Sequence, residues 1–463
     1  MDELIRASAV EVVGRLARGE VRPGELLDAL AARIAAVDGQ VNALPTLCWE
    51  RARAARPVAP LHGLPVAVKD LSEVRGVRTT HGSPIYAGHI PKADAHVVER
   101  IEAAGGAIHA KSNTPEFGAG AQTFNAVFGV TRNPWNTALT PAGSSGGAAV
   151  ALKTGMAWLA HGSDLGGSLR NPASFCGIVG LRPSVGRVPR GPSADPWASL
   201  SVDGPMARTV ADVALFLDAL SGADPREPLS LPAPAEPFLA AAQAPRLPRR
   251  VAFSADLGGL TPVDPEVAGL CAAAARRLEA LGVEVVEASP DFTGAHEAFQ
   301  TLRALGFAAG HAGHLRDHRD KLKADVVWNI EKGLALSGAE VGEALRLRGV
   351  LMARMRVFME RYDLFLCPAT IVPPFPVEEP YVAECAGVRF ETYVDWLAVA
   401  YAITLTGHPA LSLPCGFTAA GLPVGLQMVG GWQGEAALLS QAAALEAELA
   451  LDAAPIDPRP PAG

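Results

Sequence analysis

The serines of two glycine-rich turns are the residues of this sequence whose setting best suits covalent chemistry. Ser144 and Ser145 stand in the run PAGSSGG over 141–147, and Ser168 stands in GSDLGGSLR over 162–170. Because glycine has no Cβ, such turns let backbone N–H groups converge on one point. A serine beside converging N–H groups can attack a carbonyl carbon while these donors hold the developing oxyanion.

A lysine upstream is a candidate base for these serines. Lys69 closes the apolar segment 61–68, which predicts that its amine is removed from water. Desolvation disfavours the charged form of an amine and therefore lowers its pKa. The alternative is a surface lysine whose charge is paired with Asp70, since most lysines keep the ammonium group in water. Together, the two turns and the lysine predict an acyl-transfer enzyme.

The elements that must position these residues include both helices and strands. Leu and Ala at helical spacing predict two helices over 3–37, broken at 19–23, and a capping box at Thr209 predicts a helix to Leu220. Further helices are predicted over 95–104, 265–281, most of 292–360, and 435–449. Short apolar runs predict strands over 61–68, 107–110, 250–253, 283–286, 364–367, 410–413 and 424–429. The strands on either side of helix 265–281 make a βαβ-like unit, which is typical of the α/β class.

The length of 463 residues suits one large α/β domain or two smaller ones. We expect one large domain with a helical region over 292–360 that covers the site. The predicted division is an N-terminal helical region (1–60), a core (61–224), a proline-rich linker or long loop (225–249), a C-terminal α/β part (250–450) and a tail (451–463).

Composition argues against several classes of function. A net charge of −8 provides no basic face for nucleic acid or anionic lipid. The N-terminus lacks the pattern of a signal peptide, and the longest nearly apolar run (148–160) is too short to span a membrane. Six widely spaced cysteines without a CxxC pair indicate reduced, mostly buried thiols. We therefore expect a cytoplasmic protein that binds neither nucleic acid nor membranes.

Other interpretations of the two glycine-rich turns are also consistent with the sequence at this point. GSSGG over 143–147 also satisfies G-x-S-x-G, the nucleophile elbow of α/β-hydrolases, with Ser145 as nucleophile and a downstream histidine as base. That reading leaves Lys69 and the turn at 166–168 unexplained. A phosphate-binding loop would need a following Lys-Ser/Thr pair, which is missing. Either turn alone could also be a simple connection between a strand and a helix.

Two further clusters could carry chemistry. His311, His314 and His318 could share one helix face and bind a metal, although the neighbouring Arg316 and Arg319 would oppose a cation. Cys176 could be a nucleophile, but its surroundings are apolar and no histidine is near it in the sequence. We expect no metal site and a buried, unreactive Cys176.

The chain resembles the amidase signature family of serine hydrolases. The resemblance rests on LHGLPVAVKD (61–70), PAGSSGGAA (141–149) and GSDLGGSLRNP (162–172), continued by ASFCGIVGLRP (173–183). Shorter matches are NTPEF (113–117), GPM (204–206) and PVGLQ (423–427). The likeness is strong over about 1–220 and returns near 405–430. It implies an α/β/α fold in which helices flank a mixed central sheet.

The resemblance implies a role for each matched residue. Ser168 is the expected nucleophile, Ser144 the bridging serine in a cis-peptide setting, and Lys69 the base. Ser144 rather than Ser145 matches because it precedes Ser168 by 24 positions, the interval expected in the family. The expected oxyanion hole is made of the N–H groups of Leu165, Gly166, Gly167 and Ser168. Asp164 and Arg170, with Gly143 and Ser145, would support the two turns.

Departures from the family pattern bear on which activity to expect. Small residues replace small ones at Ala142, Ala148 and Ser163, so the catalytic positions are not in doubt. The A-type subunits of tRNA-dependent amidotransferases usually carry a tyrosine-glycine pair and a Ser-Leu-Asp-Gln run where this chain has RVPRGP (187–192) and ASLSVD (198–203). We therefore expect a stand-alone amidase that needs no cofactor. The alternatives are an amidotransferase component that works with partner proteins and a non-catalytic binding protein of the same fold.

The expected substrate is a small carboxamide, with esters or carbamates as possible side substrates and water as the second reactant. Aromatic side chains and one glutamine are candidate walls of the substrate pocket: Phe117, Gln122, Phe124, Trp197, Trp328 and Trp396. Aromatic residues are more often part of a core than of a site. We expect a monomer or a homodimer.

Overall fold

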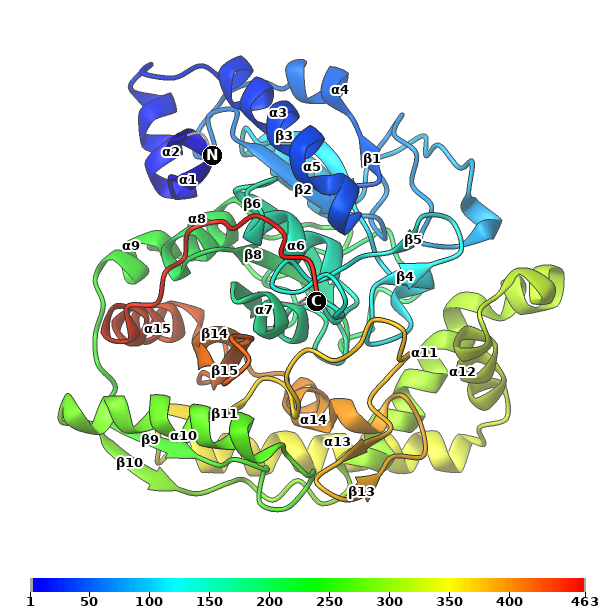
Figure 1. Cartoon of the computed structure of the whole chain (residues 1–463). Coiled ribbons are helices and arrows are strands. Elements are labelled where there is room, and N and C mark those ends of the chain that lie inside the picture. Colours follow the sequence, from blue (N-terminus) through cyan, green and yellow to red (C-terminus); the bar gives the residue numbers. More distant parts are fainter. Residues whose placement is uncertain (1–2, 462–463) are drawn as a thin grey trace.

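A mixed sheet of eleven strands forms the centre of the computed structural model, which describes residues 3–461 (Figure 1). The strand order is β1-β3-β2-β6-β8-β7-β14-β15-β11-β9-β10. These strands are β1 (Thr46–Leu47), β2 (Pro65–Lys69), β3 (Ala107–Ser112), β6 (Leu159–Asp164), β7 (Val179–Arg182), β8 (Val202–Ala207), β9 (Arg250–Phe253), β10 (Glu284–Glu287), β11 (Leu364–Pro368), β14 (Ala410–Phe417) and β15 (Pro423–Val429). Two short hairpins, β4 (Phe124–Asn125) with β5 (Gly129–Val130) and β12 (Glu384–Cys385) with β13 (Val388–Arg389), lie outside the sheet.

Helices flank this sheet on both faces. They are α1 (Glu3–Arg6), α2 (Ala9–Ala17), α3 (Pro23–Val41), α4 (Trp49–Arg53), α5 (His96–Ala103), α6 (Gly146–Lys153), α7 (Arg170–Cys176), α8 (Val210–Leu220), α9 (Phe238–Gln243), α10 (Pro265–Ala280), α11 (Ala295–His318), α12 (Ala324–Leu334), α13 (Gly338–Met359), α14 (Ala398–Thr406) and α15 (Glu435–Leu449). Helices α8, α10 and α15 pack in one layer, and α6 and α7 pack against the strands in a second. The expected α/β/α arrangement with a mixed sheet is confirmed.

The site-bearing strands lie next to one another in the first half of the sheet. Strand β2 pairs in parallel with β3 and with β6, and β6 pairs antiparallel with β8. All five residues of β2 are buried, as the continuous apolar run predicts for a strand covered on both faces. Ser8 caps α2 and Thr209 caps α8, each side-chain hydroxyl accepting a hydrogen bond from a backbone N–H of the first turn. Only this half of the predicted capping box at Thr209 forms, because the carboxylate of Asp212 accepts instead from the N–H of Val10.

The second half of the chain follows the predicted pattern of strands and helices, with one additional short helix. Strands β9 and β10 pair in parallel across α10, which confirms the βαβ-like unit. The stretch 292–360 forms α11, α12 and α13, which pack together at one end of the molecule (Figure 1). Within the segment 225–249, expected to be a proline-rich linker or long loop, the short helix α9 forms and buries Phe238 against the core.

Two apolar clusters make up most of the core. The larger joins the N-terminal helices, the sheet and the layer of α8, α10 and α15. The second lies beneath α11, α13 and α14 and includes Phe299, Trp396 and Tyr401. The C-terminal tail crosses the molecule toward α6 (Figure 1). Arg33 of α3 forms an ion pair of 2.5 Å with Asp457 of this tail. Within 3–461, no helix has the length and apolar character that crossing a membrane requires.

Candidate active site

Lys69 ends strand β2 with its amine at the meeting point of three serines. The side chain is fully buried, and its Nζ donates to Ser144 Oγ at 2.7 Å, Ser145 Oγ at 2.9 Å and Ser163 Oγ at 3.0 Å. The strand positions this amine because β2 pairs with β6, the strand that carries Ser163. The surface-lysine alternative is wrong, since Asp70 pairs instead with Lys111, at 2.9 Å.

Burial gives this amine the character of a base. Removal from water lowers the pKa of Lys69 to about 7, against the opposing effects of the carboxylates of Asp203 and Asp164, and Arg190 lowers it further. A lysine with this pKa is neutral in half of the molecules near neutral pH. A neutral amine can accept a proton from a serine hydroxyl, as a general base must.

The two glycine-rich turns meet beside Lys69. The Gly143–Ser144 peptide bond is cis, as the resemblance implies, and the N–H of Ser145 donates to the carbonyl of Ser168 at 3.3 Å. The side chain of Ser168 is partly exposed and forms no hydrogen bond with Ser144 within the described chain. Catalytic hydrogen bonds in free enzymes are often long and tighten when substrate binds. The structure thus brings Ser144 to Lys69, and Ser168 to the neighbouring turn.

The turn before Ser168 differs in one respect from the expected oxyanion hole. The N–H of Gly167 donates to Asp164 Oδ1 at 2.9 Å, so this group is not free to face an oxyanion. The N–H groups of Leu165, Gly166 and Ser168 have no acceptor within residues 3–461 and stay available. Gly167 has a φ of +114°, and a Cβ there would lie 2.5 Å from Asn171 Oδ1, so the turn requires glycine.

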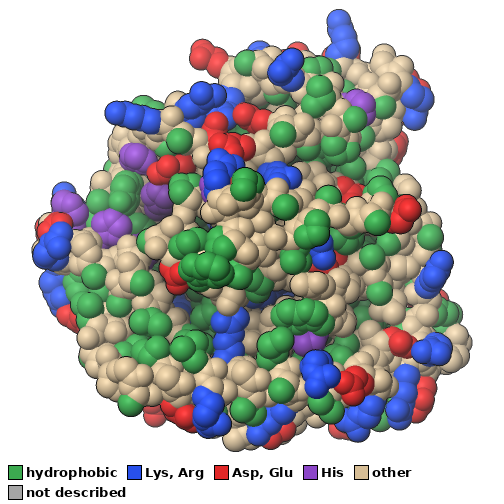
Figure 2. All heavy atoms as spheres, turned by 180° about the vertical axis from the view of Figure 1, so that it is seen from behind, with side chains coloured by type: hydrophobic (Ala, Val, Ile, Leu, Met, Phe, Trp, Pro, Cys, Tyr) green, Lys and Arg blue, Asp and Glu red, His purple; other side chains and the backbone are tan. Residues whose placement is uncertain are grey.

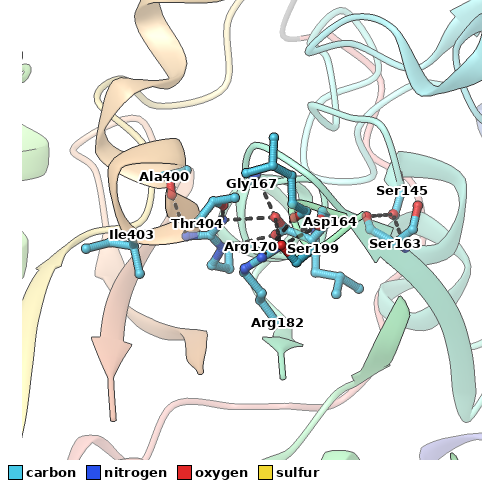
Figure 3. A network of polar contacts seen from close by, with 12 residues as sticks. Ser145, Ser163, Asp164, Gly167, Arg170, Arg182, Ser199, Ala400, Ile403 and Thr404 are labelled. Atoms are coloured by element: carbon cyan, nitrogen blue, oxygen red, sulfur yellow. Dashed lines mark hydrogen bonds and ion pairs between the residues drawn. The ribbon is translucent and has the colours of Figure 1, made fainter. Parts of the chain in front are cut away.

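A buried carboxylate holds this turn in place (Figure 3). The carboxylate of Asp164 accepts hydrogen bonds from Arg170 Nε at 3.0 Å and Nη2 at 2.9 Å, and from Arg182 Nη1 at 3.3 Å. Although burial raises the pKa of Asp164, the two guanidinium groups outweigh it and hold the pKa well below its ordinary value. Arg170 also donates to Gln427 Oε1 and to Ala400 O, so the turn is fixed to β15 and α14. Asp164 and Arg170 therefore support the turn as predicted.

We expect Asp164→Asn to destabilise the fold by about 3–5 kcal/mol, because it leaves two buried guanidinium groups without their anion. The midpoint of urea unfolding at pH 7 measures this loss. Since the folded pKa of Asp164 lies below the unfolded value, its contribution is present above about pH 4 and declines as the pH falls. Asp317→Asn is the control, because Asp317 pairs with Arg316 at the surface, where ion pairs contribute little to stability. The midpoint of urea unfolding of this variant should equal that of the wild type. An equal midpoint for both variants would contradict the supporting role of Asp164.

The predicted pocket residues lie at different distances from the turns. Gly118, the residue after Phe117, borders the site, because a Cβ there would lie 3.4 Å from Ser144 Oγ. The ring of Phe117 itself packs against His311 and His314 of α11. Gln122 lies beside the turn that carries Ser144, because a Cβ on Gly143 would lie only 2.8 Å from the Gln122 carbonyl oxygen. The side chain of Gln122 is buried, and neither of its polar atoms has a hydrogen-bond partner within 3–461. Phe124 packs beneath the ammonium of Lys323 at 4.5 Å.

The three predicted tryptophans occupy different settings. Trp328 on α12 packs edge-on against Tyr393, and Trp197 is 68% exposed in the loop before β8. Trp396 is buried against Phe375 and belongs to the core. The surface seen in Figure 2 is hollowed near its middle between apolar side chains. The pocket assignments of Phe117, Gln122, Phe124, Trp197 and Trp328 stay predictions.

The alternative centres gain no support from the geometry. The ring of His314 stacks on Phe117, and the ring of His311 packs against the same Phe117 at a tilt. Histidines gather on the α11 side of the molecule (Figure 2), but no group of side chains within 3–461 is arranged to hold a metal ion. Cys176 is buried, and burial raises the pKa of its thiol, which makes the thiolate scarce. Ser145 contacts Lys69 and the Ser163 carbonyl rather than a histidine, which disfavours the nucleophile elbow.

Three residues of the site have no role that the sequence alone predicts. Ser163 contacts Lys69, Arg182 contacts Asp164, and Gln427 contacts Arg170. Ser163 could have been found from the pairing of the strands that carry Lys69 and Asp164. Arg182 and Gln427 lie in two of the segments that carry the resemblance, 173–183 and 423–427, but the match assigns neither of them a contact. Arg182 follows its partner Asp164 by 18 residues and Gln427 follows its partner Arg170 by 257.

Comparison with known proteins agrees with this geometry. The family model described as Amidase matches residues 25–439. An acylamidase from Rhodococcus erythropolis is 35% identical over 458 residues, covering 95% of each chain. The A-type subunit of the glutamyl-tRNA(Gln) amidotransferase of Thermus thermophilus is 36% identical over 467 residues, covering 95% of this chain and 96% of its own. A solved structure of 6-aminohexanoate cyclic dimer hydrolase with substrate superposes with a TM-score of 0.90 at 28% identity, covering 99% of both chains. The chain belongs to the amidase signature family.

Proposed function

We propose that this chain, acting alone, hydrolyses the C–N bond of small carboxamides through an acyl-enzyme on Ser168. The observation that carries the proposal is the fully buried amine of Lys69, which lies 2.7 Å from Ser144 Oγ with its pKa lowered to about 7 by burial. A neutral amine at a serine hydroxyl is the arrangement that activates a serine for attack without a histidine.

Acylation begins when Ser168 Oγ attacks the amide carbonyl carbon and forms a C–O bond. Ser168 passes its proton to Ser144, which passes its own to Nζ of Lys69. The N–H groups of Leu165, Gly166 and Ser168 donate to the oxyanion of the tetrahedral intermediate. When the C–N bond breaks, Ser144 protonates the departing nitrogen and regains a proton from Lys69. The products of this half-reaction are an amine and an ester on Ser168.

Deacylation repeats the relay with water. Water attacks the ester carbonyl carbon, and its proton passes through Ser144 to Lys69. Collapse of the second intermediate breaks the bond to Ser168 Oγ, which recovers its proton by the same route. The carboxylic acid leaves, and the chain returns to its starting state. Each step uses the same donors and the same base, so no cofactor takes part in the proposed reaction.

A component of a tRNA-dependent amidotransferase is the second candidate, because the Thermus relative is as similar to this chain as the acylamidase. Such a component would pass ammonia to another active site and would need partner proteins. The segments RVPRGP (187–192) and ASLSVD (198–203) depart from the pattern usual in those proteins and favour the stand-alone hydrolase.

The test is the release of amine by the purified chain from a series of anilides, alkyl amides and cyclic amides. We expect turnover of at least one class without a partner, and loss of turnover in Ser168→Ala. An amidotransferase component would instead be inactive alone and would gain glutaminase activity with its partner proteins. A chain that hydrolyses no amide and acquires no adduct at Ser168 from a fluorophosphonate would refute the proposal.

A further inference from the structure

An arginine lies buried on the face of α11 that packs toward the two catalytic turns. Phe299, Arg303 and Phe307 are spaced four residues apart, so their side chains share one face of this helix. The ring of Phe299 lies against the turn that carries the nucleophile, because a Cβ on Gly166 would lie 2.9 Å from its Cζ. Phe307 packs in an apolar cluster with Ala119, the neighbour of the glycine that borders the other turn. Arg303 therefore lies between the two turns, about 6 Å along the helix from each phenylalanine.

The guanidinium group of Arg303 contacts only neutral groups. The residue is 6% exposed, its Nη1 donates to Asn329 Oδ1, and its Nη2 donates to the hydroxyl of Tyr393 at 2.5 Å. The rings of Phe307 and Tyr393 lie 4.6 and 5.2 Å from its central carbon and offset part of the cost of burial. Among the residues that the structure describes, no carboxylate forms an ion pair with it, and its Nε has no acceptor. Because a buried charge is normally paired, this cation is suited to an anionic partner from outside the chain.

The acidic side chains in the surroundings of Arg303 are bound to other groups. Asp325 pairs with Lys323 at 2.5 Å. Asp395 accepts a hydrogen bond from the amide of Gln300 at 2.9 Å. Lys and Arg side chains also border the hollow in the face that Figure 2 shows. The balance of charge near Arg303 therefore favours an anion.

Tyr393 adds a second kind of donor beside the guanidinium group. Its hydroxyl oxygen accepts from Arg303 and, at 2.7 Å, from Asn329 Nδ2. With these two bonds accepted, the hydroxyl proton is free to donate, and it has no acceptor within 3–461. Guanidinium N–H groups and a hydroxyl proton that converge in this way match the two oxygens of a carboxylate.

We propose that Arg303, assisted by the Tyr393 hydroxyl, anchors a carboxylate carried by the substrate, so that the chain prefers amides of acidic compounds to neutral amides. The inference rests on the proposed function and names its substrate class. The carboxylate belongs either to the acyl part or to the amine part of the amide. Both place a negative charge at one end of the substrate and the scissile bond at the catalytic turns.

The test compares kcat/KM for an acid and for its neutral methyl ester in two pairs of anilides. The first pair, the mono-4-nitroanilide of glutaric acid and its ester, carries the group on the acyl part. The second pair, N-acetyl-4-aminobenzoic acid and its ester, carries it on the amine part. Release of the aromatic amine is measured in each case. We expect the wild type to favour the acid of one pair by about 30-fold or more, the worth of one partner of a buried, hydrogen-bonded charge pair.

Variants of Arg303 show whether this residue causes the preference. In Arg303→Met, kcat/KM for the acid should fall by about 30-fold or more, and kcat/KM for the ester should change far less. Arg303→Lys keeps the charge but not the two-pronged geometry and should retain only part of the preference. Arg354→Met is the matched control, because Arg354 pairs with Asp291 at the surface at 3.0 Å, and it should keep the wild-type ratio of acid to ester.

The outcomes separate this inference from the function on which it rests. Equal hydrolysis of acid and ester in both pairs by the wild type would overturn the inference and leave the proposed function standing. A preference that Arg303→Met retains would also overturn it, and so would an equal fall for acid and ester, which a purely structural role predicts. If Arg303→Met does not fold, Arg303→Lys decides, since an unchanged ratio there would overturn the inference.

A wild type that acquires a fluorophosphonate adduct at Ser168 but hydrolyses none of the four compounds would likewise overturn the inference. Absence of both hydrolysis and the adduct would instead refute the proposed function.

Discussion

Ser168→Ala is expected to lower kcat/KM for an amide substrate by about 10⁴- to 10⁶-fold, the loss typical of removing a serine nucleophile. The substitution deletes only Oγ, the atom that forms the acyl bond, and leaves the turn that carries the oxyanion donors. Initial rates measure the loss of turnover. Intact mass after exposure to a fluorophosphonate measures the loss of the covalent adduct, and it needs no knowledge of the natural substrate.

Ser145→Ala is the matched control, since Ser145 lies in the neighbouring turn and also contacts Lys69. This variant should keep the adduct at Ser168, with a reduced rate at most. An adduct that is lost in Ser145→Ala and kept in Ser168→Ala would make Ser145 the nucleophile. Thermal unfolding of both variants shows whether a lost adduct reflects chemistry rather than loss of the fold.

The sequence predicts the site best at residues whose position in the fold follows from their immediate neighbours in the chain. The apolar run before Lys69 predicts a buried strand, and a buried strand places its last residue at the sheet edge where the glycine-rich turns converge. Glycine at 167 is likewise dictated by the backbone, because its φ excludes other residues. Features of this kind are set by neighbours in the chain, so a single sequence contains them.

Long-range contacts explain what the sequence does not indicate. Arg182 and Gln427 reach the Asp164–Arg170 pair from β7 and β15, and although both lie in segments that match the family, the sequence does not indicate which residues they contact. Helix α9 escapes prediction because prolines surround the short run FLAAAQ, and its packing against α8 and α15 stabilises it. The N–H of Gly167 is expected in the oxyanion hole, but the carboxylate three residues earlier takes it.

Lys69→Met is expected to lower kcat/KM by about 10³-fold at pH 8, within the range that general bases contribute. Methionine fills the buried space of the lysine stem without an amine, so the relay loses its proton acceptor. In the wild type, kcat/KM should rise with pH and be half-maximal near pH 7, because Lys69 is neutral only above its pKa. This rise should be absent from Lys69→Met. Lys69→Arg should also be inactive, because a guanidinium stays protonated at every accessible pH.

Lys153→Met provides a matched control within the same protein. Lys153 is also a buried lysine, and burial lowers its pKa to about 8, yet its Nζ donates to the Ala454 carbonyl of the C-terminal tail. Its replacement should reduce stability and leave the pH profile of kcat/KM unchanged. A wild-type pH profile in Lys69→Met would show that another group accepts the proton of Ser168. A lost pH dependence in Lys153→Met would show that the profile reports folding, because Lys153 has no part in the relay.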